Sequence, residues 1–445
     1  MSPTTGSLWR RDIVGWSLYD FANTIYSMNI VSLYLKRYIV EDLGYGDRYY
    51  DIPFSISMAF AALVLPALGA MSDHATRKKL FLLLFTISCC VASGLLSIVP
   101  SGMIVLTLAL FMIANFSYEA GQPFYNALLY SVAEGRQARL VSGIGVSLGY
   151  VGSILGMILV LPFVTGELFG WDVPFLDAGG KVAAFLPTAV LFFLFALPVF
   201  LWVRERPLEL PGPMTIRAGY RDVWEGIRET KKYPGVLRFL IADYFFEDAV
   251  ATVIINIGLY CSLVIGMTDE EITLFLIVST ASAVIGSYVI GLISRAVSLK
   301  RLVRAIVVGW IAALLLFVAV ENRTVIWLLG SVVGVLLGGL WTTTRPMLGE
   351  LVPHDRLGRF FGLFSLSGRA AAVVGPLIWT AVVYLFHPAQ PLGAKVSDVL
   401  NLPPDSLWLP YKTAVLALAL LMAIGLFIFR KVPDTHRGPH AQTAR

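Results

Sequence analysis

The chain has 445 residues, of which 57% are hydrophobic and 14% are charged. Soluble domains carry about 25% charged residues, so this composition indicates a polytopic membrane protein and argues against a soluble enzyme. The formal net charge is +5, and the basic residues concentrate in particular loops. That placement is typical of residues that determine membrane topology, so we expect no nucleic-acid partner.

Twelve stretches are long enough, at roughly 20 residues, to be predicted as membrane-spanning helices. The predicted spans are 13–36, 53–71, 80–99, 102–130, 140–165, 183–203, 236–264, 271–293, 302–320, 324–349, 359–386 and 411–430. Lys and Arg concentrate at the N-terminus, in the loops after even-numbered spans and at the C-terminus. The positive-inside rule then predicts two cytoplasmic termini. We expect an all-α, multi-pass protein of a bacterial inner membrane.

The first span keeps polar residues in its middle. Asp20, Asn23, Thr24 and Ser27 recur at helical spacing and form one polar stripe. A carboxylate at this depth costs about 2.5–3.5 kcal/mol on insertion scales. The stripe is therefore predicted to face protein or a water-filled cavity, not lipid.

The loop after the second span reads GAMSDHATRKK and resembles the major facilitator signature Gly-x-x-x-Asp-(Arg/Lys)-x-Gly-Arg-(Arg/Lys). Gly69, Asp73, Arg77 and Lys78 match it, whereas His74 replaces the usual base and a threonine replaces the second glycine. The resemblance implies that Asp73 pairs with a base across the interface between two half-domains. Such a pair would latch the outward-open state.

The fourth span offers a second polar stripe. Asn115, Glu119, Gln122 and Asn126 follow the spacing of one helical face. We expect an interhelical hydrogen bond from Asn115, and a cavity role for Glu119 because an ionisable group loses more in lipid.

The longest predicted cytoplasmic loop, 204–235, opens with a proline-rich linker and continues as IRAGYRDVWEGIRETKKY. Tyr220, Trp224 and Ile227 fall on one apolar helical face, and arginines and lysines occupy much of the rest. This pattern predicts a basic amphipathic helix on the inner membrane surface, and a regulatory partner site is the alternative.

The seventh span carries three acids, Asp243, Glu247 and Asp248. Helical geometry places Asp248 on one face with Asn256, while Asp243 and Glu247 share a neighbouring face. The three cannot all point into one cavity, and Asp248 is predicted to do so because it corresponds to Asp20.

Two arginines oppose these acids, Arg345 in span 10 and Arg369 in span 11, and Trp341 adds an aromatic ring beside Arg345. They can form ion pairs with the acids or bind a substrate anion such as a carboxylate or phosphate. Both can hold in turn, if a pair in the empty state opens to accept the anion.

The two halves of the chain repeat one another. Three glycines of span 5 recur with the same spacing in span 11: Gly143, Gly149 and Gly156 against Gly362, Gly368 and Gly375. Two parallel six-helix halves describe the major facilitator architecture. The predicted domains are an N-terminal half (1–203), a central loop (204–235), a C-terminal half (236–430) and a cytoplasmic tail (431–445).

Four stretches carry a narrower resemblance: GWSLYDFANTIYS, FYNALLYSVAEGRQARLVSGIGVSLGYVGSILG, VLRFLIADYFFEDAVATVI and GELVPHDRLGRFFGLFSLSGRAAAVVGPLI. They resemble the "unknown major facilitator" family, which includes the vacuole effluxer proteins of fungi. Tyr130 and Ser131 depart from it, since relatives usually carry Pro-Glu there. The fungal members are linked to amino-acid export from the vacuole, so the resemblance implies transport without naming a substrate.

We therefore expect a monomeric secondary active transporter that exports a small zwitterionic or anionic solute, such as an amino acid, by alternating access. It has no ATP-binding Gly-x-x-x-x-Gly-Lys-Ser/Thr loop, no Ser/His/Asp set and no metal cluster, so we expect neither an enzyme nor a cofactor. No histidine lies at mid-depth, so proton coupling would use Asp20, Glu119 or Asp248, and sodium is the rival ion. The alternatives are an amphiphile or lipid transporter and a non-transporting receptor of the same fold.

Overall fold

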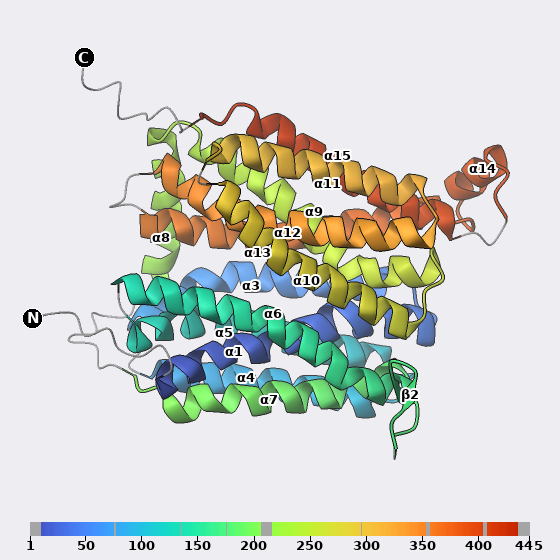
Figure 1. Cartoon of the computed structure of the whole chain (residues 1–445), viewed down its shortest axis with the longest axis horizontal. Helices are drawn as coiled ribbons and strands as arrows, with labels where there is room; N and C mark the ends of the chain where they lie inside the picture. Colours follow the sequence, from blue (N-terminus) through green and yellow to red (C-terminus); the bar gives the residue numbers. More distant parts are fainter. Residues whose placement is uncertain are drawn as a thin grey trace, which may run out of the picture. The chain divides into compact units, whose positions relative to one another are not determined.

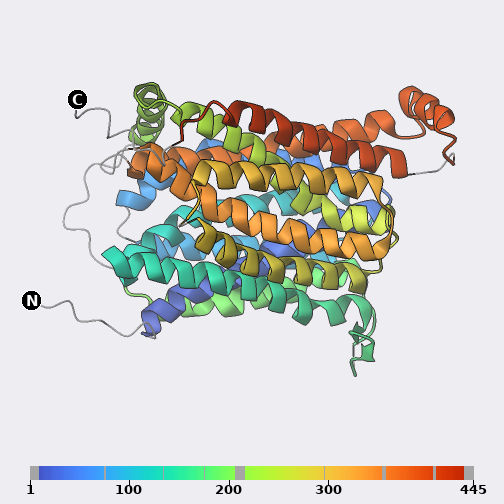
Figure 2. The ribbon, with the colours of Figure 1, turned by 45° about the horizontal axis from the view of Figure 1, so that its top comes forward.

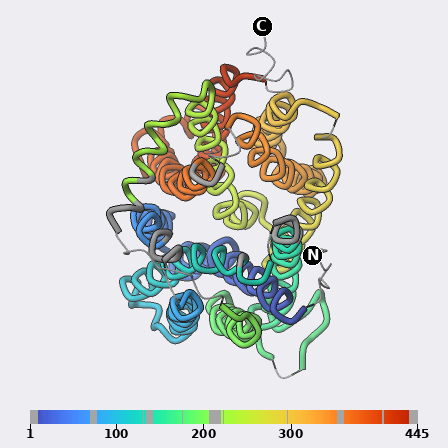
Figure 3. Tube along the Cα trace, turned by 90° about the vertical axis from the view of Figure 1, so that its left-hand side faces the viewer, coloured from blue at the N-terminus to red at the C-terminus, as the bar shows by residue number. Residues whose placement is uncertain are grey.

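The computed structural model describes residues 10–74, 77–133, 135–174, 176–205, 216–294, 296–352, 357–403 and 407–434. The chain divides into two compact units at Tyr220 and Arg221. Each unit is a bundle of long helices, seen roughly end-on in Figure 3, and each is described by itself.

Unit 1 begins with a long helical segment whose first part is labelled α1 in Figure 1. Its hydrogen-bond pattern changes along its length. It runs through α1 (Arg11–Tyr26), the π-helix η1 (Ser27–Tyr34), α2 (Leu35–Arg37) and the π-helix η2 (Tyr38–Asp42). The bundle continues with α3 (Arg48–His74), α4 (Lys78–Leu95), η3 (Leu96–Ile98), α5 (Ile104–Val132) and α6 (Gly135–Thr165). A short antiparallel ribbon, β1 (Glu167–Leu168) with β2 (Trp171–Asp172), projects past the end of α6 in Figure 2. The unit then forms η4 (Lys181–Ala184) and α7 (Phe185–Trp202).

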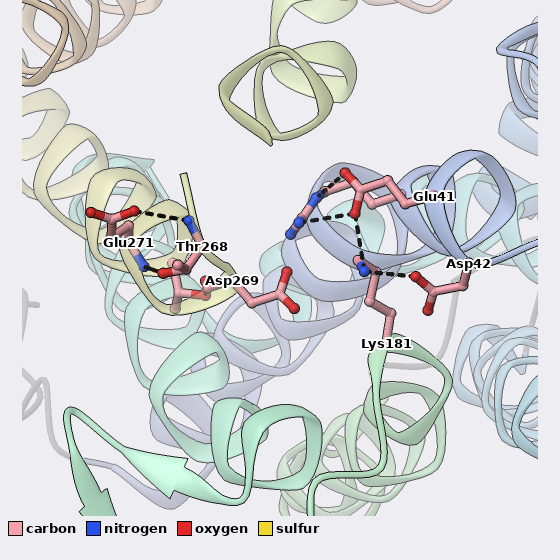
Figure 4. A network of polar contacts seen from close by, with 8 residues as sticks. Glu41, Asp42, Lys181, Thr268, Asp269 and Glu271 are labelled. Carbon is pink, nitrogen blue, oxygen red and sulfur yellow. Dashed lines mark hydrogen bonds and ion pairs between the residues drawn. The ribbon is translucent and has the colours of Figure 1, made fainter. Parts of the chain in front are cut away.

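Unit 2 contains most of α8 (Ile216–Glu229) and η5 (Thr230–Lys232), followed by α9 (Val236–Leu263) and α10 (Asp269–Ile293). The remaining helices are α11 (Leu299–Ala319), α12 (Arg323–Leu351), α13 (Leu357–Phe386), α14 (Pro391–Val399) and α15 (Trp408–Phe429). Side chains define several helix starts. Thr268 and Glu271 form a reciprocal capping box at the start of α10, drawn in Figure 4.

Ten helices within the described ranges are long and apolar enough to cross a membrane. They correspond to predicted spans 2 to 6 and 8 to 12. The first predicted span is interrupted by η1, and the seventh coincides with α9; these two are not among the ten. The molecule is an all-helical, multi-pass membrane protein.

Glycines let several of these helices touch backbone to backbone. Gly334 and Gly338 of α12 lie against the carbonyl oxygens of Ser279 and Ala283 on α10, where any added Cβ would overlap. In unit 1, Gly152 of α6 packs in the same way on the backbone of Phe21. Small residues at four-residue spacing are a usual way to pack helices tightly in membranes.

Candidate functional site

In unit 1, the carboxylate of Asp20 lies half-buried between α1 and α6. Asn23 Nδ2 approaches Asp20 Oδ1 at 3.4 Å, and Thr24 Oγ1 donates a hydrogen bond to the Gly149 carbonyl oxygen at 2.7 Å. A Cβ at Gly145 would lie 2.6 Å from Asp20 Oδ2. The predicted stripe of the first span therefore faces protein at this level, as the cost of a lipid-exposed carboxylate requires.

Aromatic rings of α1 and α5 pack beside this carboxylate. Trp16 and Tyr19 both stack on Tyr125, with ring centroids 4.6 and 4.8 Å away, and Trp16 Nε1 donates to the Tyr125 carbonyl oxygen at 3.1 Å. The Tyr125 hydroxyl is close enough to Asp20 for an electrostatic interaction. Asp20 thus has a defined polar and aromatic surrounding within unit 1.

The stripe on α5 passes from buried to exposed. Asn115 Nδ2 donates to Ser57 Oγ on α3 at 2.8 Å, so the predicted interhelical hydrogen bond is confirmed. Glu119 is 5% exposed and interacts electrostatically with Tyr26 of α1. Gln122 is half-buried and Asn126 is exposed, so only the latter part of the stripe is open to another molecule.

In unit 2, Asp248 is fully buried against α13. Its Oδ1 accepts a hydrogen bond from the Gly375 backbone N–H at 2.6 Å. Asn256, also fully buried, donates to the Thr252 carbonyl oxygen at 2.8 Å on its own helix. The Asp248 bond joins α9 to α13, and both of these predicted site residues are buried.

Glu247, one residue earlier, has the polar partners expected of a binding site. Trp341 Nε1 of α12 donates to Glu247 Oε2 at 3.1 Å. Arg345 of α12 and Arg369 of α13 both act on Glu247 electrostatically. Arg345 is exposed and Arg369 half-exposed, so the two guanidinium groups remain reachable.

Asp243 lies one helical turn before Glu247 and is 1% exposed. Neither of its carboxyl oxygens has a hydrogen-bond partner among the described residues. The sequence pattern favours Asp248 over Glu247 and Asp243 because it relies on the match to Asp20. The signal that would have selected Glu247 is the pair of arginines that it faces, which becomes visible only once α12 and α13 are packed.

The predicted latch is described in part. Arg77 caps α4 and Lys78 is its first residue, whereas the side chains of Gly69 and Asp73 lie outside the described residues. At the same helix start, the backbone N–H of Lys79 donates to the Glu205 carboxylate, and Lys79 Nζ donates to the Val203 carbonyl oxygen at 2.6 Å. An acid at the positive end of a helix dipole is favourable, so Glu205 joins the end of α7 to the start of α4.

A network of charges holds together the end of unit 1 that contains η2. Lys36 Nζ lies 2.7 Å from Asp51 and 3.0 Å from Asp47, and all three side chains are at most 5% exposed. Nearby, Lys181 Nζ reaches Glu41 at 3.0 Å and Asp42 at 2.7 Å, as Figure 4 shows. In the described parts of the chain, no group of three or more His, Cys, Asp or Glu could hold a metal ion.

Comparison with known proteins agrees with this architecture. Over residues 49–388 the chain matches the family model described as "Vacuole effluxer Atg22 like". It is 24% identical over 429 residues to an uncharacterized MFS-type transporter, YxiO, of Bacillus subtilis, and the match covers 94% of each chain. It is also 24% identical over 305 residues to autophagy-related protein 22-1 of Sclerotinia sclerotiorum, covering 60% of this chain and 49% of that protein.

Solved structures give the same fold. A bacterial homologue of the human lysosomal transporter Spinster, in an inward-facing and unoccupied conformation, superposes with a TM-score of 0.73 at 14% identity, covering 96% of this chain and 98% of that one. The nucleoside transporter NupG gives 0.70 at 14% identity, covering 95% and 98%. The chain therefore belongs to the Atg22-like vacuole effluxer family and has the fold of major facilitator transporters.

Proposed function

We propose that this protein is a secondary active transporter that exports a small zwitterionic or anionic organic solute, such as an amino acid, in exchange for protons. The observation that carries the proposal is the mixed-charge cluster of unit 2, in which Glu247 faces Trp341, Arg345 and Arg369. Charged groups in membrane-spanning helices are costly, and they commonly mark substrate or ion pathways.

In this proposal the two arginines bind the carboxylate of the substrate. Guanidinium groups hold carboxylates through paired, charge-assisted hydrogen bonds, and both are partly exposed within unit 2. The Trp341 ring offers an apolar surface beside them, and Glu247 offers a negative charge for an ammonium group. In unit 1, described by itself, Asp20, Asn23, Gln122 and Asn126 are separate candidates for binding a substrate or an ion. Their half-buried to exposed placement supports a role for all but Asn23, which is buried.

The family match supports export, because the matching model is described as "Vacuole effluxer Atg22 like". The resemblance to the fungal members supports the amino-acid class. We propose that an ion gradient, and not a nucleotide, drives the transport. Alternating access of two halves around one site is the usual mechanism of such transporters. We propose a monomer in a bacterial inner membrane, with both termini in the cytoplasm.

The test is substrate exchange in liposomes containing the purified protein. Vesicles loaded with a mixture of unlabelled amino acids should take up a labelled one from outside, and Arg369→Gln and Arg345→Gln should each reduce that exchange at least tenfold. Arg304→Gln, at an exposed position near the start of α11, is the matched control and should keep normal exchange. Binding without exchange would indicate a receptor, and exchange of lysolipids alone would indicate an amphiphile transporter.

A further inference from the structure

Asp243 has a buried carboxyl group that the contacts among the described residues do not account for. It lies on α9, inside unit 2, and is 1% exposed. Neither oxygen has a hydrogen-bond partner in the part of the chain that the structure describes. An ionised carboxylate without partners is among the most unfavourable groups that a protein interior can hold, whereas a protonated one costs far less.

The charges around Asp243 do not offset a negative charge there. The charged group found to act on it is Glu247, one turn later on the same helix, which repels an ionised Asp243. On the helices packed against α9, Arg345 of α12 and Arg369 of α13 act on Glu247. α15 has no charged residue between Lys412 and Arg430, and α10 has none after Glu271.

The two acids therefore have different surroundings, although they are neighbours. Glu247 has an indole N–H and two guanidinium groups to support an ionised carboxylate. Asp243 is buried, has no hydrogen-bond partner among the described residues and lies near the negative charge of Glu247. Two carboxyl groups in such unequal positions are expected to hold one proton between them, on the unsupported member.

We propose that Asp243 and Glu247 form a pair that binds either one proton or the ammonium group of the substrate. This inference rests on the proposed transport function and adds the residues that couple it to protons. In the empty state Asp243 carries the proton and Glu247 is ionised. When the substrate binds, its carboxylate binds Arg345 and Arg369, and its –NH3+ group binds the pair of Asp243 and Glu247.

The charge balance explains the exchange. Without substrate the pair has a net charge of one negative unit, from Glu247. With substrate, both carboxylates are ionised and the ammonium group supplies one positive unit. The charge of the pair together with the ammonium group is therefore unchanged, while the Asp243 O–H bond breaks and its proton leaves to water. The negative charge of the substrate carboxylate is balanced separately by the arginines. Proton and substrate then compete for one site, which is the condition for exchange in opposite directions.

The first experiment needs no substrate. Infrared spectra of the full-length protein in lipid vesicles at neutral pH should contain the C=O band of a protonated carboxyl group, and Asp243→Asn should remove a component of that band. The exposed Glu321→Gln should leave every component in place. An unchanged band in Asp243→Asn would overturn the pair whether or not transport is found. Asn has nearly the shape of a protonated Asp, and Asp243→Ser is a second variant without a carboxyl group should the first fail to fold.

The second experiment measures the coupling. Addition of a mixture of neutral amino acids to the purified wild-type protein should release protons, detected with a pH-sensitive dye, and Asp243→Asn should release none. In liposomes this variant should still exchange amino acids but lose acceleration by a pH gradient. Exchange with unchanged acceleration would contradict the pair. Absence of exchange in the wild type, with the infrared component lost in Asp243→Asn, would instead leave the proton site standing and reject the amino-acid substrate.

Discussion

Trp341 Nε1 donates a hydrogen bond to Glu247 Oε2 at 3.1 Å, and this bond joins α12 to α9 through side chains that lie among charged groups. A hydrogen bond to a charged acceptor contributes about 1.5–3 kcal/mol when buried, and less here because Trp341 is 37% exposed. The bond orients Glu247 relative to the two arginines, so its loss should affect substrate binding more than folding.

Trp341→Phe should therefore raise the substrate concentration needed for half-maximal exchange roughly threefold to tenfold, because the ring remains and the donor is lost. The measurement is concentration-dependent exchange in liposomes. Trp171→Phe in the exposed β2 strand is the control and should behave as the wild type. An unchanged half-maximal concentration would show that the bond does not position Glu247.

Lys36 balances two buried carboxylates, so its removal should destabilise unit 1. Lys36→Met would leave Asp47 and Asp51 without their shared cation, and breaking a buried pair in this way costs about 3–5 kcal/mol. Thermal unfolding of the purified protein in detergent should show a clearly lowered midpoint. Lys395→Met, on the exposed surface of α14, should leave the midpoint in place. Equal midpoints for the two variants would mean that the buried pair contributes no net stability.

Glu321, in the loop between α11 and α12, predicts a small pH effect. Hydrogen bonds donated by Lys412 and then by Trp408 hold the pKa of Glu321 below its ordinary value of 4.5. A lowered pKa contributes stability above the unfolded value, and that contribution is lost as the pH falls through the folded value. Because Glu321 is largely exposed, the effect should be under about 1 kcal/mol. Glu321→Gln should thus lower the unfolding midpoint at neutral pH but not in acid well below 4.5, and a pH-independent difference would contradict this account.

The signature loop gives a prediction about conformation. Asp73→Asn should slow exchange while leaving the unfolding midpoint within a few degrees, because a latch specific to one state is lost. Exchange and unfolding are measured on the same preparations, and Asp398→Asn in the exposed α14 is the control. Normal exchange by Asp73→Asn would remove the latch role.

The exposed face of α8 predicts contact with lipid. Tyr220, Trp224 and Ile227 are each at least 40% exposed and lie within one face, with Arg221 and Arg228 beside them. In Figure 1, α8 runs across the long helices of unit 2 and not along them. A helix with this orientation and composition suits a membrane surface with anionic headgroups.

This contact can be measured with the three native cysteines replaced and a single probe attached at position 227. Its fluorescence should shift to the blue in vesicles that contain phosphatidylglycerol, compared with phosphatidylcholine alone. A probe at position 225, which lies on nearly the opposite face of the helix, should shift less. Equal spectra in both lipids would favour a protein partner for this face.

The membrane-spanning helices could be predicted from the sequence because length and apolar composition largely determine which segments cross a bilayer. The sequence could not show which acid of α9 faces the arginines. Asp248 and Glu247 differ by one residue, or about 100° of helix rotation, and that rotation is set by the packing of Gly375 against Asp248. No local pattern in α9 contains this information.

The repeat between the two halves of the chain predicts the order of the helices, but it does not predict which residues of neighbouring helices touch. If Asp20 corresponds to Asp248 and Gly156 to Gly375, then Gly156 should face Asp20. It faces Ile25 and Asn29 instead, while Asp20 faces Gly145. The two halves share helix order, but the first helix of each half is shifted differently along its glycine-bearing neighbour. In unit 1, the π-helical segment that starts at Ser27 further changes the spacing, and it has no clear sequence signal.

The glycine contacts between α12 and α10 have a mechanical consequence. Where Gly334 and Gly338 touch the backbone of α10, backbone atoms that cannot change rotamer make the nearest contacts, so sliding of one helix along the other would force atoms to overlap. The two helices are therefore expected to move together as one rigid body, and Trp341 and Arg345 of α12 move with it. Glu247 belongs to α9, which is not part of that rigid body. Motion of α10 and α12 relative to α9 would therefore change the hydrogen bond between Trp341 and Glu247.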